Sequence, residues 1–232
     1  MIVLLTGASG GIGQILTDFL LNKGYTVAAQ VHKGSLPKRE RLHVFSANLD
    51  NAGEREQLVK DIQRSVGNPE VFIHNAGVNI NAMSWKYSLE DWNRVMEVNV
   101  NAAFHISSLL IPAMREKKFG RIVYVSSVVA FQGVVGTAPY AASKAALLGL
   151  MRAQSAELAG KNITVNAVAP GYLNAGMIHQ VPEELQLQIQ QKIPMGYFGN
   201  PEEMAAFIGF LLLDDARYIT GQTLHFNGGL FG

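Results

Sequence analysis

Ile2-Val3-Leu4-Leu5-Thr6-Gly7-Ala8-Ser9-Gly10-Gly11-Ile12-Gly13 is the stretch of this sequence that decides its fold. The apolar run at residues 2–5 is typical of a buried strand, and the glycines after it let the backbone turn tightly before a helix begins. Such a turn brings a diphosphate to the positive end of the helix. A glycine-rich turn without a ligand is the alternative, but the position at the first strand-helix junction favours dinucleotide binding.

Short apolar segments alternate with segments of helical length along the rest of the chain. Strands that are apolar at nearly every position are buried on both faces, and their alternation with helices predicts right-handed crossovers and a parallel sheet. The sequence therefore predicts a Rossmann-type, doubly wound α/β fold of about seven strands with helices on both faces, in one domain over residues 1–232. The predicted strands are residues 2–5, 26–31, 42–47, 71–74, 121–126, 163–168 and 223–226.

One segment is ambiguous by its pattern. Residues 185–190 alternate between leucine or isoleucine and glutamine, as an exposed strand would. The Glu, Gln and Leu content, and Pro182 just before it, favour a helix. We therefore predict a helix here.

Composition excludes several classes of function. The formal charge is +1 and basic runs are short, so the sequence does not indicate a nucleic-acid surface. There is no cysteine, and the six histidines do not have metal-ligand spacing, so we expect no metal site. The apolar runs are too short for a membrane span, and the chain opens without a charged leader. We expect a cytoplasmic protein with no membrane association.

Tyr140 and Lys144 are four residues apart, which places both side chains on one face of a helix. An adjacent ammonium favours the phenolate and lowers the pKa of a tyrosine, so the pair could deliver a proton to an oxygen. Taken alone, such a pair is usually a solvated helix face. Its neighbours in the sequence are what favour an active site.

Several further motifs follow predicted strands or lie on predicted helices: Asn75-Ala76-Gly77, Asn99, Ser126-Ser127 and Pro170-Gly171. Together with the glycine turn and the pair of Tyr140 and Lys144, they give the chain a clear resemblance to the short-chain dehydrogenase/reductase family. Within that family it is most similar to the 3-oxoacyl-acyl-carrier-protein reductases, through residues 140–145, 166–171, 198–203 and 219–225.

The resemblance implies a catalytic tetrad. Tyr140 would give its proton to a carbonyl oxygen as hydride reaches the carbon, and Lys144 would lower the pKa of the tyrosine and bind the nicotinamide ribose. Ser127 would donate a hydrogen bond to the same oxygen, and Asn99 would hold a water that links Lys144 to solvent. Taken separately, Ser127 could only end a strand and Asn99 could only cap a helix.

The resemblance also implies a set of cofactor-binding residues. NADP(H) is favoured over NAD(H), because Gln30-Val31-His32-Lys33 has no carboxylate to repel a 2′-phosphate and two basic side chains that could pair with it. Both could instead be exposed loop residues. The implied residues are Gly7, Ser9, Gly10, Gly11, Ile12, Gly13, His32, Lys33, Asn48, Leu49, Asn75, Ala76, Gly77, Tyr140, Lys144, Pro170, Gly171 and Leu173.

Three residues depart from the family pattern. Gly10 stands where many NADP-using relatives carry an arginine, and Asn48 where an aspartate usually faces the adenine. Ala175 replaces a threonine that usually meets the diphosphate; the loss of one neutral hydrogen bond costs about 1 kcal/mol. We expect weaker cofactor binding and not a loss of function.

Residues 174–198 correspond to the substrate lid of the family. Their apolar content, which includes Met177, suits an acyl chain or another apolar ketone. About half of these side chains could instead pack the lid onto its own domain.

The reaction that the resemblance implies is NADPH-dependent reduction of a ketone to a secondary alcohol. The substrate would be a 3-oxoacyl thioester on acyl-carrier protein, as in fatty-acid or polyketide-type synthesis. A dehydrogenase of a small alcohol, sugar or steroid-like ketone is the alternative among enzymes, and a nucleotide-sensing regulator of the same fold is the alternative outside them.

Two kinds of macromolecular partner are implied as well. Lys118 and Lys161 resemble basic carrier-protein contacts, and Arg115, Lys117, Arg121 and Arg152 are nearby in sequence. Such lysines could equally serve solubility. The resemblance further implies a homotetramer, built through the long helices after the fourth and fifth strands and through the last strand.

Overall fold

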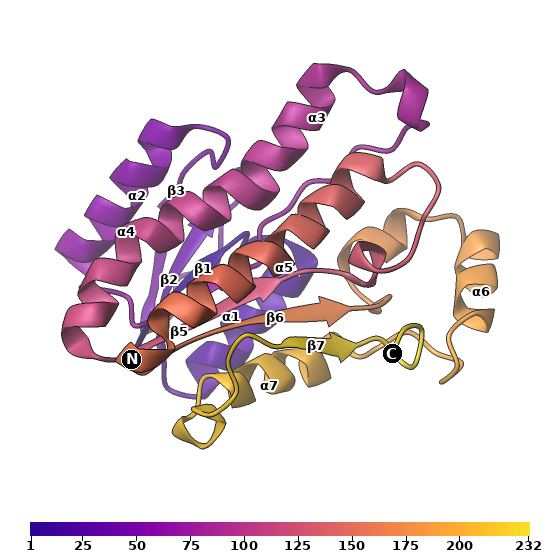
Figure 1. Ribbon diagram of the computed structural model, residues 1–232. Helices are drawn as coiled ribbons and strands as arrows, with labels where there is room; N and C mark the ends of the chain where they lie inside the picture. Colours follow the sequence, from indigo (N-terminus) through magenta and orange to yellow (C-terminus); the bar gives the residue numbers. More distant parts are fainter.

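A computed structural model describes residues 1–232, apart from the side chains of Met177 and Gln180. Seven parallel strands form one sheet in the order β3-β2-β1-β4-β5-β6-β7 (Figure 1). The predicted strands are all present, with ends shifted by a residue or two, and the predicted fold class is confirmed. The strands are β1 (Ile2–Thr6), β2 (Thr26–Val31), β3 (Leu42–Ser46), β4 (Val71–His74), β5 (Gly120–Val125), β6 (Ile163–Pro170) and β7 (Thr223–Phe226).

Helices cover both faces of the sheet (Figure 1). One face carries α2 (Ala52–Ser65), α4 (Ala102–Lys117) and α5 (Ala138–Leu158), and the other carries α1 (Gly11–Asn22) and α7 (Pro201–Leu211). Leu4 packs in the same cluster as Ile106 of α4, whereas the next residue, Leu5, packs with Leu16 of α1. Alternate residues of β1 thus enter opposite cores, which is why the strand is apolar throughout.

The remaining helical segments lie at the ends of strands. The helix α3 (Leu89–Met96) continues through a π-helical turn, η2 (Glu97–Asn101), into α4, and α6 (Glu183–Gln191) stands apart from the sheet, as Figure 1 shows. The predicted helix around residues 185–190 is therefore confirmed. Short 3₁₀ turns complete the chain: η1 (Ser84–Lys86), η3 (Val128–Ala130), η4 (Ala159–Lys161), η5 (Gly176–Gln180) and η6 (Asp214–Ala216). None of the helices described has the length and apolar character to cross a bilayer.

The order of the strands reverses at β1. The chain passes from β1 to β2 and β3 on one side, then returns to place β4 on the other side of β1. Ligands of open α/β sheets bind where this reversal leaves a crevice at the carboxyl ends of the strands. The glycine turn follows β1 and Asn75 follows β4, so both border the crevice.

The glycine turn depends on one close approach. A Cβ on Gly13 would lie 2.1 Å from the carbonyl oxygen of Gly7, because the first turn of α1 packs directly on the backbone that leaves β1. Gly7 itself has a φ of 67°, which favours glycine. Gly10 has a φ of −72° and an ordinary contact distance of 3.5 Å for the same added atom.

We predict that Gly13→Ala lowers the Tm by roughly 5 °C or more, because overlap with the Gly7 carbonyl outweighs the better helix propensity of alanine. Gly10→Ala is the matched control in the same turn and should shift the Tm by about 2 °C or less. Thermal unfolding followed by circular dichroism measures both. Equal Tm values for the two variants would contradict the close approach.

Candidate active site

The four residues of the predicted tetrad lie together at the carboxyl end of β5. Ser127 follows that strand, and Tyr140 and Lys144 project from the first turns of α5. The Lys144 ammonium donates to the carbonyl oxygen of Val125 at 2.8 Å and lies 5.5 Å from the ring centroid of Tyr140. The Ser127 hydroxyl is near enough to the Tyr140 phenol to lower its pKa. An acid, a second oxygen donor and a cation are thus within reach of one another.

Asn99 is the fourth member and sits in the π-helical turn between α3 and α4. Its side-chain amide donates to the carbonyl of Val78 at 3.0 Å and to the Ser143 hydroxyl at 2.9 Å, and its Oδ1 accepts from Val78 N–H at 2.8 Å. Both amide protons are therefore used. Asn99 does not cap a helix, since the helical run continues through it. Extra-residue turns of this kind are frequent at functional sites.

Gly77, in the segment after β4, packs closely against the tetrad. A Cβ there would lie 3.2 Å from the Lys144 Nζ and 3.5 Å from the Asn99 Oδ1. A side chain at this position would move the ammonium by a few tenths of an ångström. The glycine of Asn75-Ala76-Gly77 thus leaves room for Lys144 in its present position.

The electrostatics of the pair differ from the sequence prediction. Burial raises the pKa of the Tyr140 phenol to about 12, although the hydrogen bond with Ser127 acts in the opposite direction. Burial also lowers the pKa of the Lys144 ammonium to about 8. The pKa of Tyr140 is thus shifted in the direction opposite to the one that the sequence predicts, because loss of water on burial disfavours the phenolate. At neutral pH the phenol keeps its proton.

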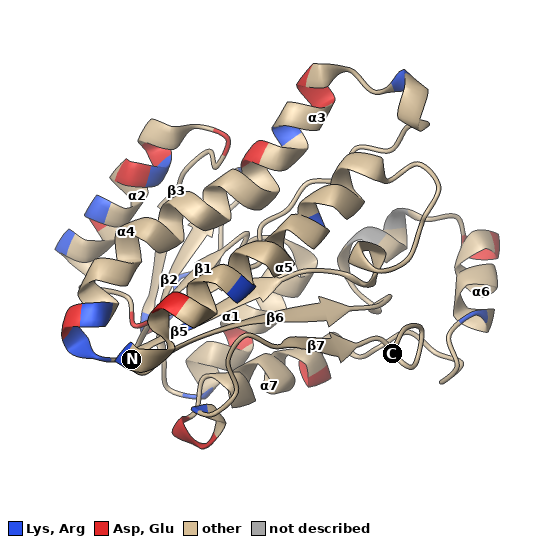
Figure 2. Cartoon of the chain, viewed as in Figure 1, with Lys and Arg blue, Asp and Glu red and all other residues tan. Residues whose placement is uncertain are grey.

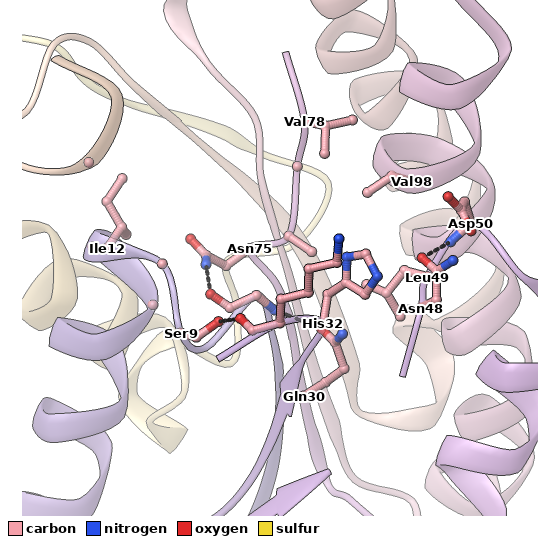
Figure 3. Close-up of a pocket in the computed structure, with 18 of the residues that line it drawn as sticks. Ser9, Ile12, Gln30, His32, Asn48, Leu49, Asp50, Asn75, Val78 and Val98 are labelled. Atoms are coloured by element: carbon pink, nitrogen blue, oxygen red, sulfur yellow. Dashed lines mark hydrogen bonds between the residues drawn. The ribbon is translucent and has the colours of Figure 1, made fainter. Parts of the chain in front are cut away.

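A cavity of about 390 Å³ opens between the glycine turn and the ends of β2, β4 and α3 (Figure 3). Its walls include thirteen of the predicted cofactor residues. Figure 3 shows His32, Asn48 and Asn75 from three separate segments converging on it. The thirteen are Gly7, Ser9, Gly10, Gly11, Ile12, Gly13, His32, Lys33, Asn48, Leu49, Asn75, Ala76 and Gly77.

The other predicted cofactor residues lie outside this lining. Tyr140 and Lys144 belong to the tetrad, and Leu173 is buried in the apolar cluster beside Val125. Pro170 ends β6, and an added Cβ on Gly171 would contact the backbone of Asn227 at 2.9 Å.

Six lining residues were missed by sequence reasoning: Gln30, Asp50, Val78, Arg94, Val98 and Gly176. Gln30 had a signal, since it is a polar residue in the apolar run of β2. Its Oε1 accepts from Gly7 N–H at 2.9 Å and its Nε2 donates to the Ala47 carbonyl at 2.7 Å. Arg94 and Val98 are four residues apart and lie on one face of a helical run. Their spacing gave no signal, because only the tertiary structure shows that this face points toward the cavity.

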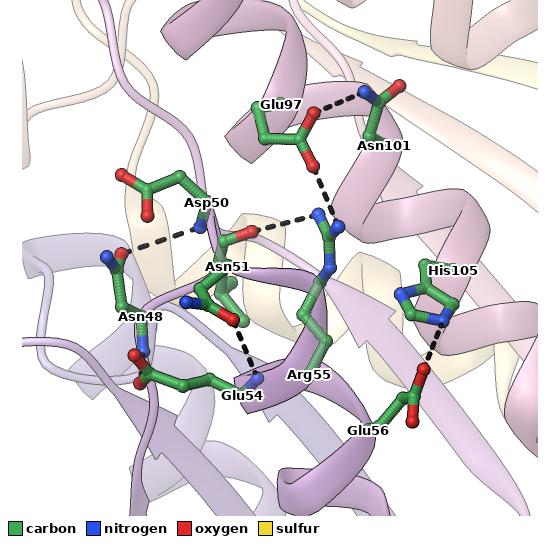
Figure 4. A network of polar contacts seen from close by, with 10 residues as sticks. Asn48, Asp50, Asn51, Glu54, Arg55, Glu56, Glu97, Asn101 and His105 are labelled. Atoms are coloured by element: carbon green, nitrogen blue, oxygen red, sulfur yellow. Dashed lines mark hydrogen bonds and ion pairs between the residues drawn. The ribbon is translucent and has the colours of Figure 1, made fainter.

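A buried ion pair connects the cavity wall to the π-helical turn (Figure 4). Arg55 is 3% exposed; its Nη1 donates to the Leu49 carbonyl at 3.0 Å and its Nη2 lies 2.7 Å from the Glu97 carboxylate. Glu97 in turn accepts from Asn101. The Leu49 wall is thereby fixed relative to the turn that carries Asn99.

The cavity fits a dinucleotide. The first turn of α1 has no acidic side chain, and Gly10 at its N-cap makes no side-chain capping bond, so its N–H groups can face a diphosphate. A Cβ on Gly11 would lie 2.9 Å from Gly176 N, so a side chain there would fill the cradle. No cluster of metal-ligating side chains occurs among the residues described.

His74 is a buried group that the sequence prediction did not use. It ends β4 with no exposed surface; its Nδ1 lies 3.0 Å from the Thr6 hydroxyl, and its Nε2 has no partner among the described residues. Burial lowers its pKa to about 3, the Lys144 charge lowers it further, and the carbonyls of Asn99 and Val98 act in the opposite direction. A histidine in an otherwise apolar strand was the signal for it.

A phenol, a serine hydroxyl and a lysine beside a dinucleotide cavity on a doubly wound sheet define a nicotinamide-dependent oxidoreductase. A family model described as enoyl-(acyl carrier protein) reductase matches residues 7–231. The chain belongs to the short-chain dehydrogenase/reductase family and is an oxidoreductase that acts on CH–OH groups.

Curated relatives match over nearly the whole chain. A 3-oxoacyl-[acyl-carrier-protein] reductase FabG of Thermotoga maritima is 36% identical over 238 residues, which cover 99% of this chain and 97% of the relative. Proteins of the same name from Staphylococcus aureus and Salmonella typhimurium are 35% and 33% identical, covering 98% and 99% of this chain and 97% of each relative. The resemblance to this subfamily is confirmed.

We predict that His74 makes the protein less stable in acid. The unfolded chain takes up a proton near pH 6.5, whereas native His74 takes it up only near pH 3. Between these values the unfolded state binds more protons, so the free energy of unfolding falls as pH decreases, by at most about 1.4 kcal/mol per pH unit, and this effect is absent above pH 6.5.

Urea unfolding from pH 8 to about 4.5 tests this. His74→Asn should give a shallower decline below about pH 6.5 than the parent chain, while the carboxylates contribute equally to both proteins. Parallel curves for the two proteins would show that His74 is protonated in the native state.

Proposed function

We propose that this protein is a cytoplasmic enzyme that reduces 3-oxoacyl thioesters on acyl-carrier protein to 3-hydroxyacyl thioesters, with NADPH as reductant. The observation that carries the proposal is the Ser127–Tyr140 pair beside Lys144, next to a cavity that fits a dinucleotide. The names of the curated relatives support the substrate class.

The reaction requires a proton donor on the ketone oxygen and a hydride on its carbon. When bound, the reduced nicotinamide supplies the hydride. Ser127 and Tyr140 hold the carbonyl oxygen through their hydroxyls, and Tyr140 gives up its proton as negative charge develops there. The phenolate that remains is stabilised by the ammonium of Lys144, whose pKa of about 8 keeps it mostly charged at neutral pH.

Asn99 contributes to the proposed reaction by holding neighbouring segments and a water molecule. Its amide protons are occupied by Val78 and Ser143, so a water linking Lys144 to solvent would be held by its oxygen atoms. Ser143 also donates to the carbonyl of Tyr140 at 2.7 Å. Asn99 thus supports the first turn of α5 as well as a proton path.

The preference for NADPH rests on charge. His32 and Lys33 are exposed at the end of β2, and the Ser9 hydroxyl donates to the Lys33 carbonyl at 3.5 Å, which keeps this loop beside the glycine turn. Arg94 adds a third basic side chain to the cavity, against the single carboxylate of Asp50. This balance favours a phosphate on the adenosine ribose.

Residues 174–198 are proposed as the substrate lid. Ile178 and Ile193 are buried in the chain itself, whereas Leu187 and Met195 are exposed at 57% and 61%. The exposed members are available to an acyl chain. Met177, also part of the predicted lid, has a side chain outside the described residues.

The carrier contacts Lys118 and Lys161 lie far from the tetrad in their own chain. They precede β5 and β6, at the amino ends of the strands, and the Asn162 side chain donates to the Lys118 carbonyl at 3.2 Å. The tetrad lies at the carboxyl end of β5, about 20 Å away along that strand of six residues. Figure 2 shows the basic cluster at the end of α4, away from α6.

Two of the neighbouring basic residues, Arg121 and Lys117, form ion pairs within the chain. Arg121 has no exposed surface and pairs with Asp214 at 3.1 Å, and Lys117 pairs with Glu70. Arg121 is near Lys118 in the sequence but does not contribute to the surface around it. A buried guanidinium needs its partner and is not available to a carrier protein.

A homotetramer would bring the two lysines to an active site. Phe104 on α4 is 55% exposed, and Ala145 and Gly149 on α5 are also exposed, so the outer faces of these helices suit close packing. A two-fold axis perpendicular to these helices would reverse their direction and place the carboxyl end of α4 beside the amino end of the partner's helices. We propose that each carrier protein is held by one subunit and reduced by its partner.

We predict that Tyr140→Phe reduces turnover of a 3-oxoacyl thioester at least 10³-fold, on the order expected for removal of an essential acid, and leaves NADPH affinity within about threefold. Absorbance of the reduced nicotinamide measures turnover, and fluorescence titration measures binding. Retained turnover would refute the assigned acid.

The same titration, repeated on the parent chain with NADH, checks cofactor choice; equal affinities would remove the NADPH assignment. The family model is described as an enoyl reductase, whereas the curated relatives are named 3-oxoacyl reductases. Rates measured with a 2-enoyl thioester and with a 3-oxoacyl thioester distinguish these two activities. Faster reduction of the enoyl substrate would contradict the proposed ketone.

We predict that Lys118→Glu with Lys161→Glu raises the KM for the carrier-bound substrate about tenfold or more, because an acidic carrier loses two complementary charges. The KM for the same acyl group on a small thiol should stay unchanged, which serves as the control. Equal effects on both substrates would contradict carrier docking at these lysines.

A further inference from the structure

Tyr87 is a half-buried residue in an otherwise exposed segment. Of residues 81–90, Ala82 and Tyr87 alone are not exposed. The phenol oxygen of Tyr87 lies 2.7 Å from the carbonyl oxygens of Ile80 and Gly136, and it accepts from Ala82 N–H at 3.0 Å. One phenolic proton is therefore shared between two carbonyls while the oxygen receives an amide proton. An exposed loop does not need three such bonds for stability.

These contacts join two loops that start at the active site. The first loop begins at Val78, which lines the cavity and is bonded on both its N–H and its carbonyl by Asn99. It then turns back on itself at Ile80 and Ala82, where Tyr87 holds it.

The second loop connects the two proton-donating residues, Ser127 and Tyr140. Its Gly136 carbonyl receives both the Tyr87 hydroxyl and the Ala82 N–H, the latter at 3.2 Å. Gly136 has a φ of 79°, a conformation that favours glycine and aims this carbonyl at the first loop. The phenol is thus the point at which the two loops meet.

We propose that Tyr87 is a positioning residue that fixes these two loops as one wall of the ketone site. The inference rests on the proposed ketone reduction for its consequence, but the joining of the loops is independent of it. Among the residues that the structure describes, the hydrogen bonds of Tyr87 go to Ile80, Ala82 and Gly136, none of which belongs to the tetrad or to the cavity lining. Tyr140 keeps its own anchor through Ser143 and Asn99, so loosening the wall acts on ketone binding and not on the acid.

The chain carries its own reporters of this wall. Its two tryptophans, Trp85 and Trp92, flank Tyr87 in the sequence, at 77% and 39% exposure. Tryptophan fluorescence of the whole protein therefore reports mainly on the segment that Tyr87 holds. No label or activity is needed to observe it.

Tyr87→Phe in the full-length protein is the test, and Tyr218→Phe is the matched control, since Tyr218 is 98% exposed. Tyr87→Phe should lower the fluorescence anisotropy of the tryptophans and raise the KM for a 3-oxoacyl thioester about fivefold, with kcat and NADPH affinity within twofold. The control should change none of these quantities.

The outcomes separate the two proposals. Unchanged anisotropy in Tyr87→Phe would overturn the positioning role, whether or not the protein reduces ketones. Lower anisotropy with an unchanged KM would also overturn it, because the loops would then not form the ketone wall. A loss of kcat and of NADPH affinity together would show a general structural defect and would likewise contradict it. If the parent chain reduces no ketone, anisotropy alone decides whether Tyr87 joins the loops, and the proposed function fails separately.

Discussion

The side-chain amide of Asn99 is the constraint on which the active site depends. It bonds Val78 on both backbone groups and donates to Ser143, which in turn bonds the carbonyl of Tyr140. Three segments far apart in sequence are held by one buried residue, and an unpaired amide at this depth would cost about 1–3 kcal/mol per group. Asn99 lies in the π-helical turn, and this turn directs its side-chain amide toward the segment after β4 without interrupting the helical run.

Burial sets the chemistry of the neighbouring groups more than their mutual charges do. Tyr140 and Lys144 are both shifted toward their neutral forms, and His74 is held neutral beside them. A site of this kind keeps the phenol protonated until a ligand changes its surroundings. The proposed acid, Tyr140, is therefore in the form that can donate a proton, which suits reduction of a carbonyl better than abstraction of a proton from an alcohol at neutral pH.

Local sequence signals predicted the fold because both faces of the sheet are covered. Strands such as β1 and β4 are apolar at nearly every position, and their alternation with helices is typical of one architecture, the doubly wound parallel sheet. The proposed tetrad was predicted from motifs, since each member follows a strand or lies on a helix of recognisable pattern. Arg55, Arg94 and Tyr87 were not found, because their roles come from distant contacts to Leu49, the cavity and Gly136. Nor did sequence spacing show that Lys118 lies at the amino ends of the strands, opposite the end that carries the tetrad.

The π-helical turn also links the two halves of the site. On the cofactor side, Arg55 connects Glu97 of this turn to Leu49 in the cavity wall. On the side of the proposed ketone site, Asn99 connects the same turn to Val78. A hydride donor and a proton donor must meet one carbonyl group from different directions, and a misplacement of about 1 Å can cost 10²-fold in rate. Because both walls are bonded to a single turn of five residues, their separation is fixed by local geometry and not by the packing of the whole domain.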